Sequence, residues 1–201
     1  MTVSDIAGFS NTQERFLANA LQIVLAGLIV GGIVLGRFDI AVSGSLALAV
    51  TLMPALLKRE FSYTLDPELL LWLTIAVILH TAGSLGLYRQ LQWYDYITHA
   101  VSATVVAGIG YASFRALELH SDEIDVPPVF RSVFVVVFVL ATGIFWEGLE
   151  FAAGDLITVY GIDDIVTDMI FNAVGATIVA IWGTGYVNGL TRFFRRRLRR
   201  A

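Results

Sequence analysis

Long apolar runs separated by short polar segments dominate the pattern of this chain. Six runs approach or exceed the roughly 20 helical residues that cross a hydrocarbon core of ~30 Å. They are unbroken rather than alternating, which favours membrane helices over the short alternating strands of a barrel. The sequence therefore predicts an all-α, polytopic transmembrane helix bundle of about six spans, at residues 16–35, 40–57, 69–88, 94–114, 130–152 and 164–187.

Composition supports a membrane environment for the whole chain. Of its 201 residues, 57% are hydrophobic and only 15% are charged, whereas soluble domains are typically ~45–50% apolar and ~25% charged. There is too little charge to cover a surface that faces water. The length fits a single transmembrane domain, 1–201. Cysteine is absent, which excludes disulfides, zinc–thiolate sites and thiol catalysis.

Lys and Arg are distributed unevenly between the predicted loops. With the amino terminus inside, the outer loops hold only Arg37 and Arg89, and this bias predicts a cell-membrane protein with both termini cytoplasmic. The basic tail at 188–201 is expected to contact anionic lipid headgroups, which explains its arginines better than nucleic-acid binding does. The inner segments then hold all the other basic residues: Arg15, Lys58, Arg59, Arg115, Arg131, Arg192, Arg195, Arg196, Arg197, Arg199 and Arg200.

Ionisable residues inside the spans are costly in lipid, so each one calls for an explanation. Here they lie near the carboxyl ends of the third and fifth spans and near the amino ends of the fourth and sixth. Because successive spans run in opposite directions, all of these residues fall on the outer side of the membrane, within about two turns of the interface at ~1.5 Å per residue. The set consists of His80, Tyr88, Asp95, His99, Glu147, Glu150, Asp164 and Asp168, with the polar Asn172 one turn beyond Asp168.

Several carboxylates in one low-dielectric pocket cannot all remain ionised without compensation. A divalent cation could neutralise them, they could share protons, or they could pair with Arg37, Arg89 and a protonated histidine. Carboxylate and His residues three or four apart on neighbouring helices are typical of metal sites in helical bundles. The candidate metal ligands are Asp95, His99, Glu147, Glu150, Asp164 and Asp168.

Within this set, His99 and Glu147 are the candidate catalytic bases, while His80, Tyr88 and Asn172 are further polar site residues. Structural explanations compete with these roles. Asp95 and Asp164 are in positions where an acidic residue can cap a helix. His80 could be a core histidine bonded to a backbone carbonyl.

Three short motifs resemble those of YjdF-type inner membrane proteins and of the broader VanZ-like group. They are Tyr-Asp-Tyr-Ile-Thr-His at 94–99, Trp-Glu-Gly-Leu-Glu at 146–150 and Asp-x-x-x-Asp-x-x-x-Asn-x-x-Gly at 164–175. The VanZ-like pattern often has Arg near the start of its last helix, where this chain has Gly-Ile-Asp-Asp at 161–164, so an anion-binding step does not carry over. The shared residues are Asp95, His99, Glu147, Glu150, Asp164, Asp168 and Asn172.

The resemblance covers roughly the third to sixth spans. It implies a multi-pass membrane protein without an established activity, with a hint of cell-envelope chemistry from the link of VanZ-like members to glycopeptide resistance. Three functions are therefore open: a metal-dependent hydrolase or transferase on lipid or envelope substrates, a non-catalytic membrane assembly or partner protein, and a cation- or proton-coupled transporter. The inner halves of the spans lack a matching set of ionisable residues, which argues against transport, since a transporter needs access from both sides to a site usually near the midplane.

Overall fold

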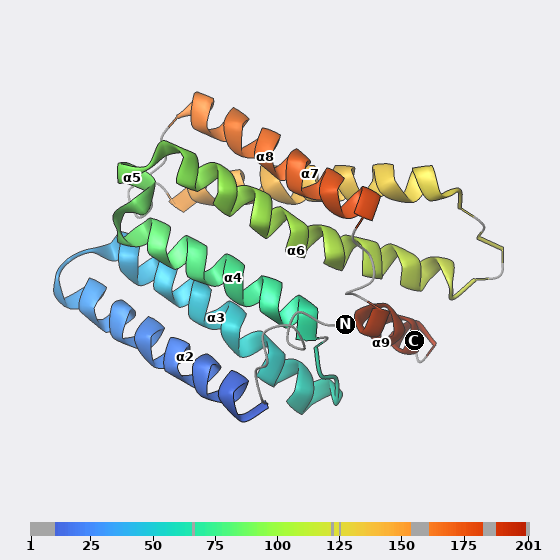
Figure 1. Ribbon diagram of the computed structural model, residues 1–201, viewed down its shortest axis with the longest axis horizontal. Coiled ribbons are helices and arrows are strands. Elements are labelled where there is room, and N and C mark those ends of the chain that lie inside the picture. Colours follow the sequence, from blue (N-terminus) through green and yellow to red (C-terminus); the bar gives the residue numbers. More distant parts are fainter. Residues whose placement is uncertain are drawn as a thin grey trace.

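The structure is a computed structural model that describes residues 11–65, 67–121, 123–124, 126–153, 161–182 and 188–199. These residues form helices and connecting turns, with no strand among them, which confirms the predicted all-helical bundle (Figure 1). The elements are α2 (Asn11–Val34), α3 (Phe38–Phe61), α4 (Pro67–Ala82), the π-helical turn η1 (Gly83–Leu87), α5 (Tyr88–Gln90), α6 (Gln92–Glu118), α7 (Pro128–Ala153), α8 (Ile162–Trp182) and α9 (Asn188–Leu198).

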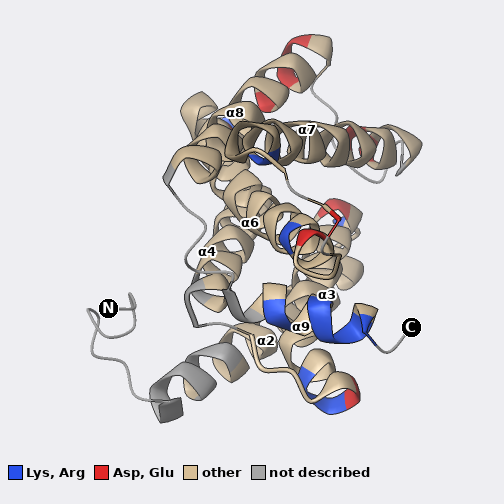
Figure 2. Ribbon diagram, turned by 90° about the vertical axis from the view of Figure 1, so that its right-hand side faces the viewer, with Lys and Arg blue, Asp and Glu red and all other residues tan. Residues whose placement is uncertain are grey.

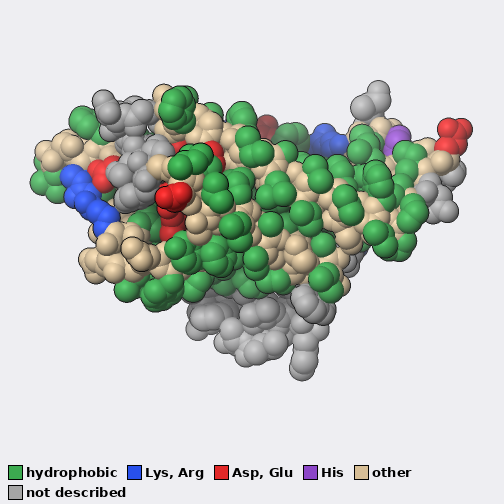
Figure 3. All heavy atoms as spheres, turned by 90° about the horizontal axis from the view of Figure 1, so that it is seen from above, with side chains coloured by type: hydrophobic (Ala, Val, Ile, Leu, Met, Phe, Trp, Pro, Cys, Tyr) green, Lys and Arg blue, Asp and Glu red, His purple; other side chains and the backbone are tan. Residues whose placement is uncertain are grey.

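Four helices of the described part, α3, α6, α7 and α8, are each long and apolar enough to cross a membrane. Helix α2 holds a shorter apolar stretch, Asn19–Val34, and α4 is a 16-residue helix that η1 and α5 extend. The six predicted spans thus correspond to helical segments, although the third is bent and residues 183–187 of the sixth lie outside the described residues. On the face seen in Figure 3, many hydrophobic side chains lie exposed between the two ends.

Helix α6 is the centre of the bundle. It packs against α4 on one side and against α7 and α8 on the other, while α3 packs on α4 and α2 packs on α3. Its buried face is made of small residues, and Ala107, Ala112 and Ala116 have no exposed surface. Small residues allow membrane helices to approach closely. At Gly175 of α8, an added Cβ would collide with the backbone oxygen of Ala100, so this glycine sets the α6–α8 spacing.

A kink at η1 interrupts the third predicted span. Gly86 has φ 135°, a left-handed conformation that L-residues with a side chain rarely adopt. The ring of Tyr88 lies directly against Gly83, where no Cβ could fit. The kink therefore folds the Tyr88 ring back along α4, toward His80. The apolar pattern of 69–88 alone indicated a straight span and did not predict this turn.

The two ends of the bundle differ in charge. We call the end that carries Lys58, Arg59, Arg115 and Arg131 the basic end; Figure 2 looks onto it, and helix α9 with Arg195–Arg197 lies there too. The opposite end, with Asp95, Glu150 and Asp164, is called the acidic end. This segregation of charge matches the sequence-based prediction for the residues that the structure describes. The side chain of Arg15 and all of Arg200, which the prediction also placed at the basic end, lie outside the described residues.

The basic tail is not a loose extension in its described part. Helix α9 packs against α6, and its Leu190 and Phe193 are buried in a core cluster that includes Tyr63. The rings of Tyr63 and Phe193 stack with centroids 4.3 Å apart, and the Arg197 guanidinium lies 4.4 Å from the centroid of the Phe61 ring. One face of α9 is thus fixed to the bundle and leaves exposed arginines on the other.

Glu118 closes the basic end of α6. It lies beyond the predicted span 94–114, yet it is the last residue of α6 and is buried. Its Oε2 lies 2.7 Å from Arg115 Nη1, and its Oε1 accepts a hydrogen bond of 2.9 Å from Arg131 Nη2 of α7. This ion-paired group joins α6 to α7 on the far side of the bundle from the acidic residues.

We expect Glu118→Gln to lower the free energy of unfolding by about 1–2 kcal/mol, because the hydrogen bond from Arg131 and the ion pair with Arg115 both lose the negative charge. Thermal unfolding of the purified protein in detergent measures this. Glu123→Gln, at an exposed position outside the helices, is the matched control and should leave the transition unchanged. Equal melting temperatures for the two variants would contradict the structural role of this ion pair.

Candidate metal centre and its cavity

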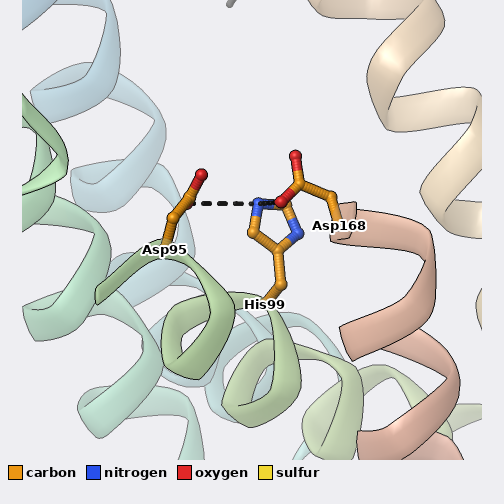
Figure 4. Close-up of side chains that lie close together, drawn as sticks. All are labelled: Asp95, His99 and Asp168. Carbon is orange, nitrogen blue, oxygen red and sulfur yellow. Dashed lines mark ion pairs between the residues drawn. The ribbon is translucent and has the colours of Figure 1, made fainter. Parts of the chain in front are cut away.

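Two helices bring three potential metal ligands together at the acidic end. Asp95 and His99 are one turn apart on α6, and Asp168 comes from the facing side of α8 (Figure 4). The Nε2 atom of His99 lies 3.5 Å from Asp95 Oδ1 and 3.5 Å from Asp168 Oδ1. One ligand atom from each residue falls within 4.8 Å of the others. We call these three residues the Asp–His–Asp group.

Asp168 is the member of this group that has a buried carboxylate oxygen without a hydrogen-bond partner. Its side chain is only 6% exposed, and the unpartnered oxygen is Oδ1. The 3.5 Å separation from His99 is longer than the ~2.7–3.2 Å of a protein hydrogen bond. A buried polar oxygen without a partner is costly, and such an atom in a native structure calls for an explanation such as a bound ion.

The donor set suits a divalent cation. Zinc binds His nitrogen and carboxylate oxygen at ~2.0–2.2 Å, so two ligand atoms of a tetrahedral site lie about 3.4 Å apart. The two 3.5 Å separations match that spacing. Three protein ligands that leave a position open are typical of catalytic rather than structural sites. Carboxylate and imidazole donors also suit other divalent ions, so the group does not select one metal.

His80 lies beside this group but is fully engaged elsewhere. Its Nε2 pairs with Ser102 Oγ at 2.9 Å and its Nδ1 with the Tyr88 hydroxyl at 2.8 Å. Its partners are therefore side chains, not the backbone carbonyl considered from the sequence. The rings of His80 and His99 are 6.1 Å apart between centroids and nearly perpendicular. With both ring nitrogens occupied, His80 supports the wall beside His99 rather than offering a further ligand.

The Asp–His–Asp group faces a cavity of about 430 Å³, within the ~300–1,000 Å³ of typical ligand pockets. Asp164 and Asn172, one turn to either side of Asp168 on α8, also line it. So does Glu150, whose Oε1 accepts a hydrogen bond of 3.0 Å from Trp146 Nε1. The residues predicted to lie together at the outer side of the bundle therefore share one cavity, with a single exception.

Glu147 is that exception. It is not among the described residues that line the cavity, and its Oε1 is buried without a hydrogen-bond partner. It lies three residues before Glu150 on α7, which at ~100° per residue is roughly 60° around the helix from that residue. Sequence spacing placed it at the correct depth in the membrane but could not fix the rotation of α7.

In the described structure, the outer arginines do not pair with the acidic residues of the Asp–His–Asp group. Arg37 binds Asp39 instead, through hydrogen bonds of 3.0 Å from Nε and 2.8 Å from Nη2. Arg89 lines the cavity but forms no ion pair with a described carboxylate. Helix α3 also contributes to the cavity, through Asp39 and Ser43. The apolar pattern does not indicate this contribution, and its only signal in the sequence is the closeness of Asp39 to Arg37.

An apolar helical bundle with buried polar groups near one end defines a multi-pass membrane protein with a candidate site within the membrane. Residues 16–189 match the family described as predicted membrane protein DUF2238, and the chain belongs to this family. No curated protein and no solved structure shows a significant match to the chain.

Proposed function

We propose that this protein is a metal-dependent hydrolase or transferase that acts on lipid or other cell-envelope substrates. Asp95, His99 and Asp168 are the ligands of one divalent cation in this proposal. The observation that carries it is the approach of three ligand atoms from two helices, one of them on a buried and unpartnered carboxylate, at the wall of a cavity.

A bound cation would supply an activated water or polarise a substrate oxygen. His99 is then a ligand and not the general base considered from the sequence. Glu150 and Asp164 line the same cavity and are the carboxylates available to move a proton to or from a substrate. Trp146 holds Glu150 in position through its indole N–H.

The acidic end faces the non-cytoplasmic side in this proposal. The support is the positive-inside rule, because the basic end collects most of the Lys and Arg residues. The exposed arginines of α9 would contact anionic headgroups of the inner leaflet, where each basic residue near the surface contributes ~1 kcal/mol of attraction. The resemblance of the three motifs to YjdF-type and VanZ-like proteins stays a prediction and agrees with an envelope substrate.

Elemental analysis of the purified protein, followed by titration with Zn²⁺ and Mn²⁺, tests the metal centre. The wild-type protein is expected to bind one cation per chain. His99→Ala should bind it roughly 100-fold more weakly or not at all, because even indirect partners of metal ligands change affinity 10–100-fold. His120→Ala, at an exposed position beyond α6, is the matched control. Equal affinity in both variants, or no binding by the wild type, would refute the metal centre.

A further inference from the structure

The lining of the cavity changes from polar to apolar from the acidic end toward the middle of the bundle. Near the acidic end its wall is made largely of charged and hydroxyl side chains. His80, Ser102, Thr142 and Asn172 follow at intermediate depth, and beyond them, toward the middle of the bundle, the lining is aliphatic. The polar part includes Asp39, Ser43, Arg89, Asp95, His99, Glu150, Asp164 and Asp168; the apolar part includes Leu46, Ala47, Val50, Leu73, Val77, Val105, Val106 and Val139.

The cavity extends over the same length along three of the helices that line it. On α3 the lining runs from Asp39 to Val50, on α6 from Asp95 to Val106, and on α7 from Glu150 back to Val139. At 1.5 Å per residue each stretch is about 16 Å long. Half of a ~30 Å hydrocarbon core has nearly this thickness. The cavity therefore extends from a polar end to the level expected for the middle of the bilayer.

The wall of the cavity is not continuous around its circumference. Helices α3 and α7 both contribute lining residues, yet within the described parts of the chain they do not contact each other, and α3 does not contact α8. Helix α6 forms the floor between the two sides. Leu46 of α3 lines the cavity while 43% of its surface remains exposed. The cavity is thus open between α3 and α7 in the described structure.

We propose that the cavity binds one hydrocarbon chain of a membrane lipid that carries a phosphate headgroup, and that this lipid enters sideways between α3 and α7. The aliphatic part of the cavity takes the chain, and burial of each CH₂ favours binding. The phosphate lies at the Asp–His–Asp group and Arg89. This inference rests on the proposed function, since without a cation the carboxylates would repel a phosphate.

A phosphate is the headgroup chemistry that fits the polar end best. Cations held by one or two carboxylates commonly complete their coordination with substrate phosphate oxygens. Arg89 is the only Lys or Arg among the described residues that line the cavity. It has no carboxylate partner among those residues and is free to bind an anion. A lipid without a phosphate would leave both the open cation position and Arg89 unused.

A phosphatidic acid with a photoactivatable diazirine at the end of its acyl chain tests this proposal. Wild-type protein in lipid nanodiscs is expected to be labelled saturably, in competition with unmodified phosphatidic acid. Mass spectrometry should locate the label on the apolar lining of α3, α6 and α7, around Val50, Val106 and Val139. Label spread over the outer surface of the bundle without competition would overturn the proposal.

A matched pair of variants on α3 separates the cavity from the outer surface. Leu46→Trp fills the cavity side and should weaken saturable labelling about tenfold, because extra volume in a filled site is costly. Leu52→Trp changes a residue of similar exposure, 40%, that does not line the cavity, and should label like the wild type. Equal labelling of the two variants would overturn the proposal; if Leu46→Trp fails to fold, the wild-type label map decides.

Cation titration of the same samples distinguishes the two proposals. Both variants should bind the cation as the wild type does, because neither residue belongs to the Asp–His–Asp group. Cation binding without saturable labelling would refute the lipid site and leave the metal centre standing. Saturable labelling at the apolar lining of a protein that binds no cation would refute the metal centre and leave the chain-binding cavity standing, with its phosphate assignment withdrawn.

Discussion

Asp168→Asn is expected to abolish cation binding and, at the same time, to stabilise the cation-free protein. The carboxylate is buried, its Oδ1 has no hydrogen-bond partner, and Asp95 and Asp164 line the same cavity. An amide of the same shape carries no charge and removes that conflict. Groups arranged for binding are often suboptimal for stability, and replacing them commonly stabilises a protein by ~0.5–2 kcal/mol.

The measurement is thermal unfolding with and without saturating cation. A cation present at 100 times its Kd stabilises the wild type by about 2.7 kcal/mol, and this gain should vanish in Asp168→Asn. Asp163→Asn is the matched control, since Asp163 lies on the same helix, is exposed and is not part of the cavity lining. It should keep the full cation-dependent gain.

The sign of the effect on the cation-free protein separates two functions that the sequence left open. If the acidic residues and His99 served only to hold α6 and α8 together, as in a non-catalytic assembly protein, Asp168→Asn would destabilise the cation-free protein. Polar contacts between membrane helices contribute only ~0.6 kcal/mol on average. Destabilisation together with an absence of cation binding would therefore favour the assembly function over the enzyme.

The structure also bears on transport, the third function considered. A coupled transporter needs its binding site to open to both sides, usually from near the midplane. The inner part of the cavity is lined by residues such as Val50, Val105 and Val139, and no charged residue lines it in the described structure. This arrangement favours a site that exchanges its ligand with the membrane over a path that crosses it.

The depth of the polar residues was predictable from sequence because it depends only on where they fall along spans of alternating direction. Asp95, His99 and Asp168 are accordingly at one end of the bundle. Whether these three side chains contact one another also depends on the rotation of each helix about its own axis. An apolar run without helical periodicity does not reveal that rotation. Glu147 shows this limit, since it has the predicted depth but is absent from the cavity wall.

Other features depended on contacts that no local pattern encodes. The left-handed Gly86 folds Tyr88 onto His80, and nothing in the apolar pattern distinguishes it from glycines that sit in ordinary helix. Glu118 follows the apolar run of the fourth span, and nothing local indicates that it is buried. Its burial depends on the ion pair with Arg131 of the next helix. Small residues such as Gly175 at helix contacts are a packing feature that composition can indicate.

Gly175→Ala is expected to destabilise the protein by up to about 3 kcal/mol and to weaken cation binding, although it adds only one methyl group. An added Cβ would overlap the backbone oxygen of Ala100 and approach Ala103 Cβ to 2.8 Å. Backbone atoms cannot turn aside as a flexible side chain can, so α8 must move away from α6. Overpacking of this kind typically costs ~1–3 kcal/mol, and it separates Asp168 from Asp95 and His99.

Gly148→Ala is the matched control, because it makes the same change inside α7 at a position where an added Cβ meets nothing within 4 Å. Without a clash, Ala in place of Gly favours a helix by roughly 0.5–1 kcal/mol, so this variant should be slightly more stable than the wild type and bind the cation unchanged. Thermal unfolding and cation titration of the two variants side by side measure both effects. Stabilisation of both by the same amount would show that the α6–α8 contact at Gly175 does not set the position of Asp168.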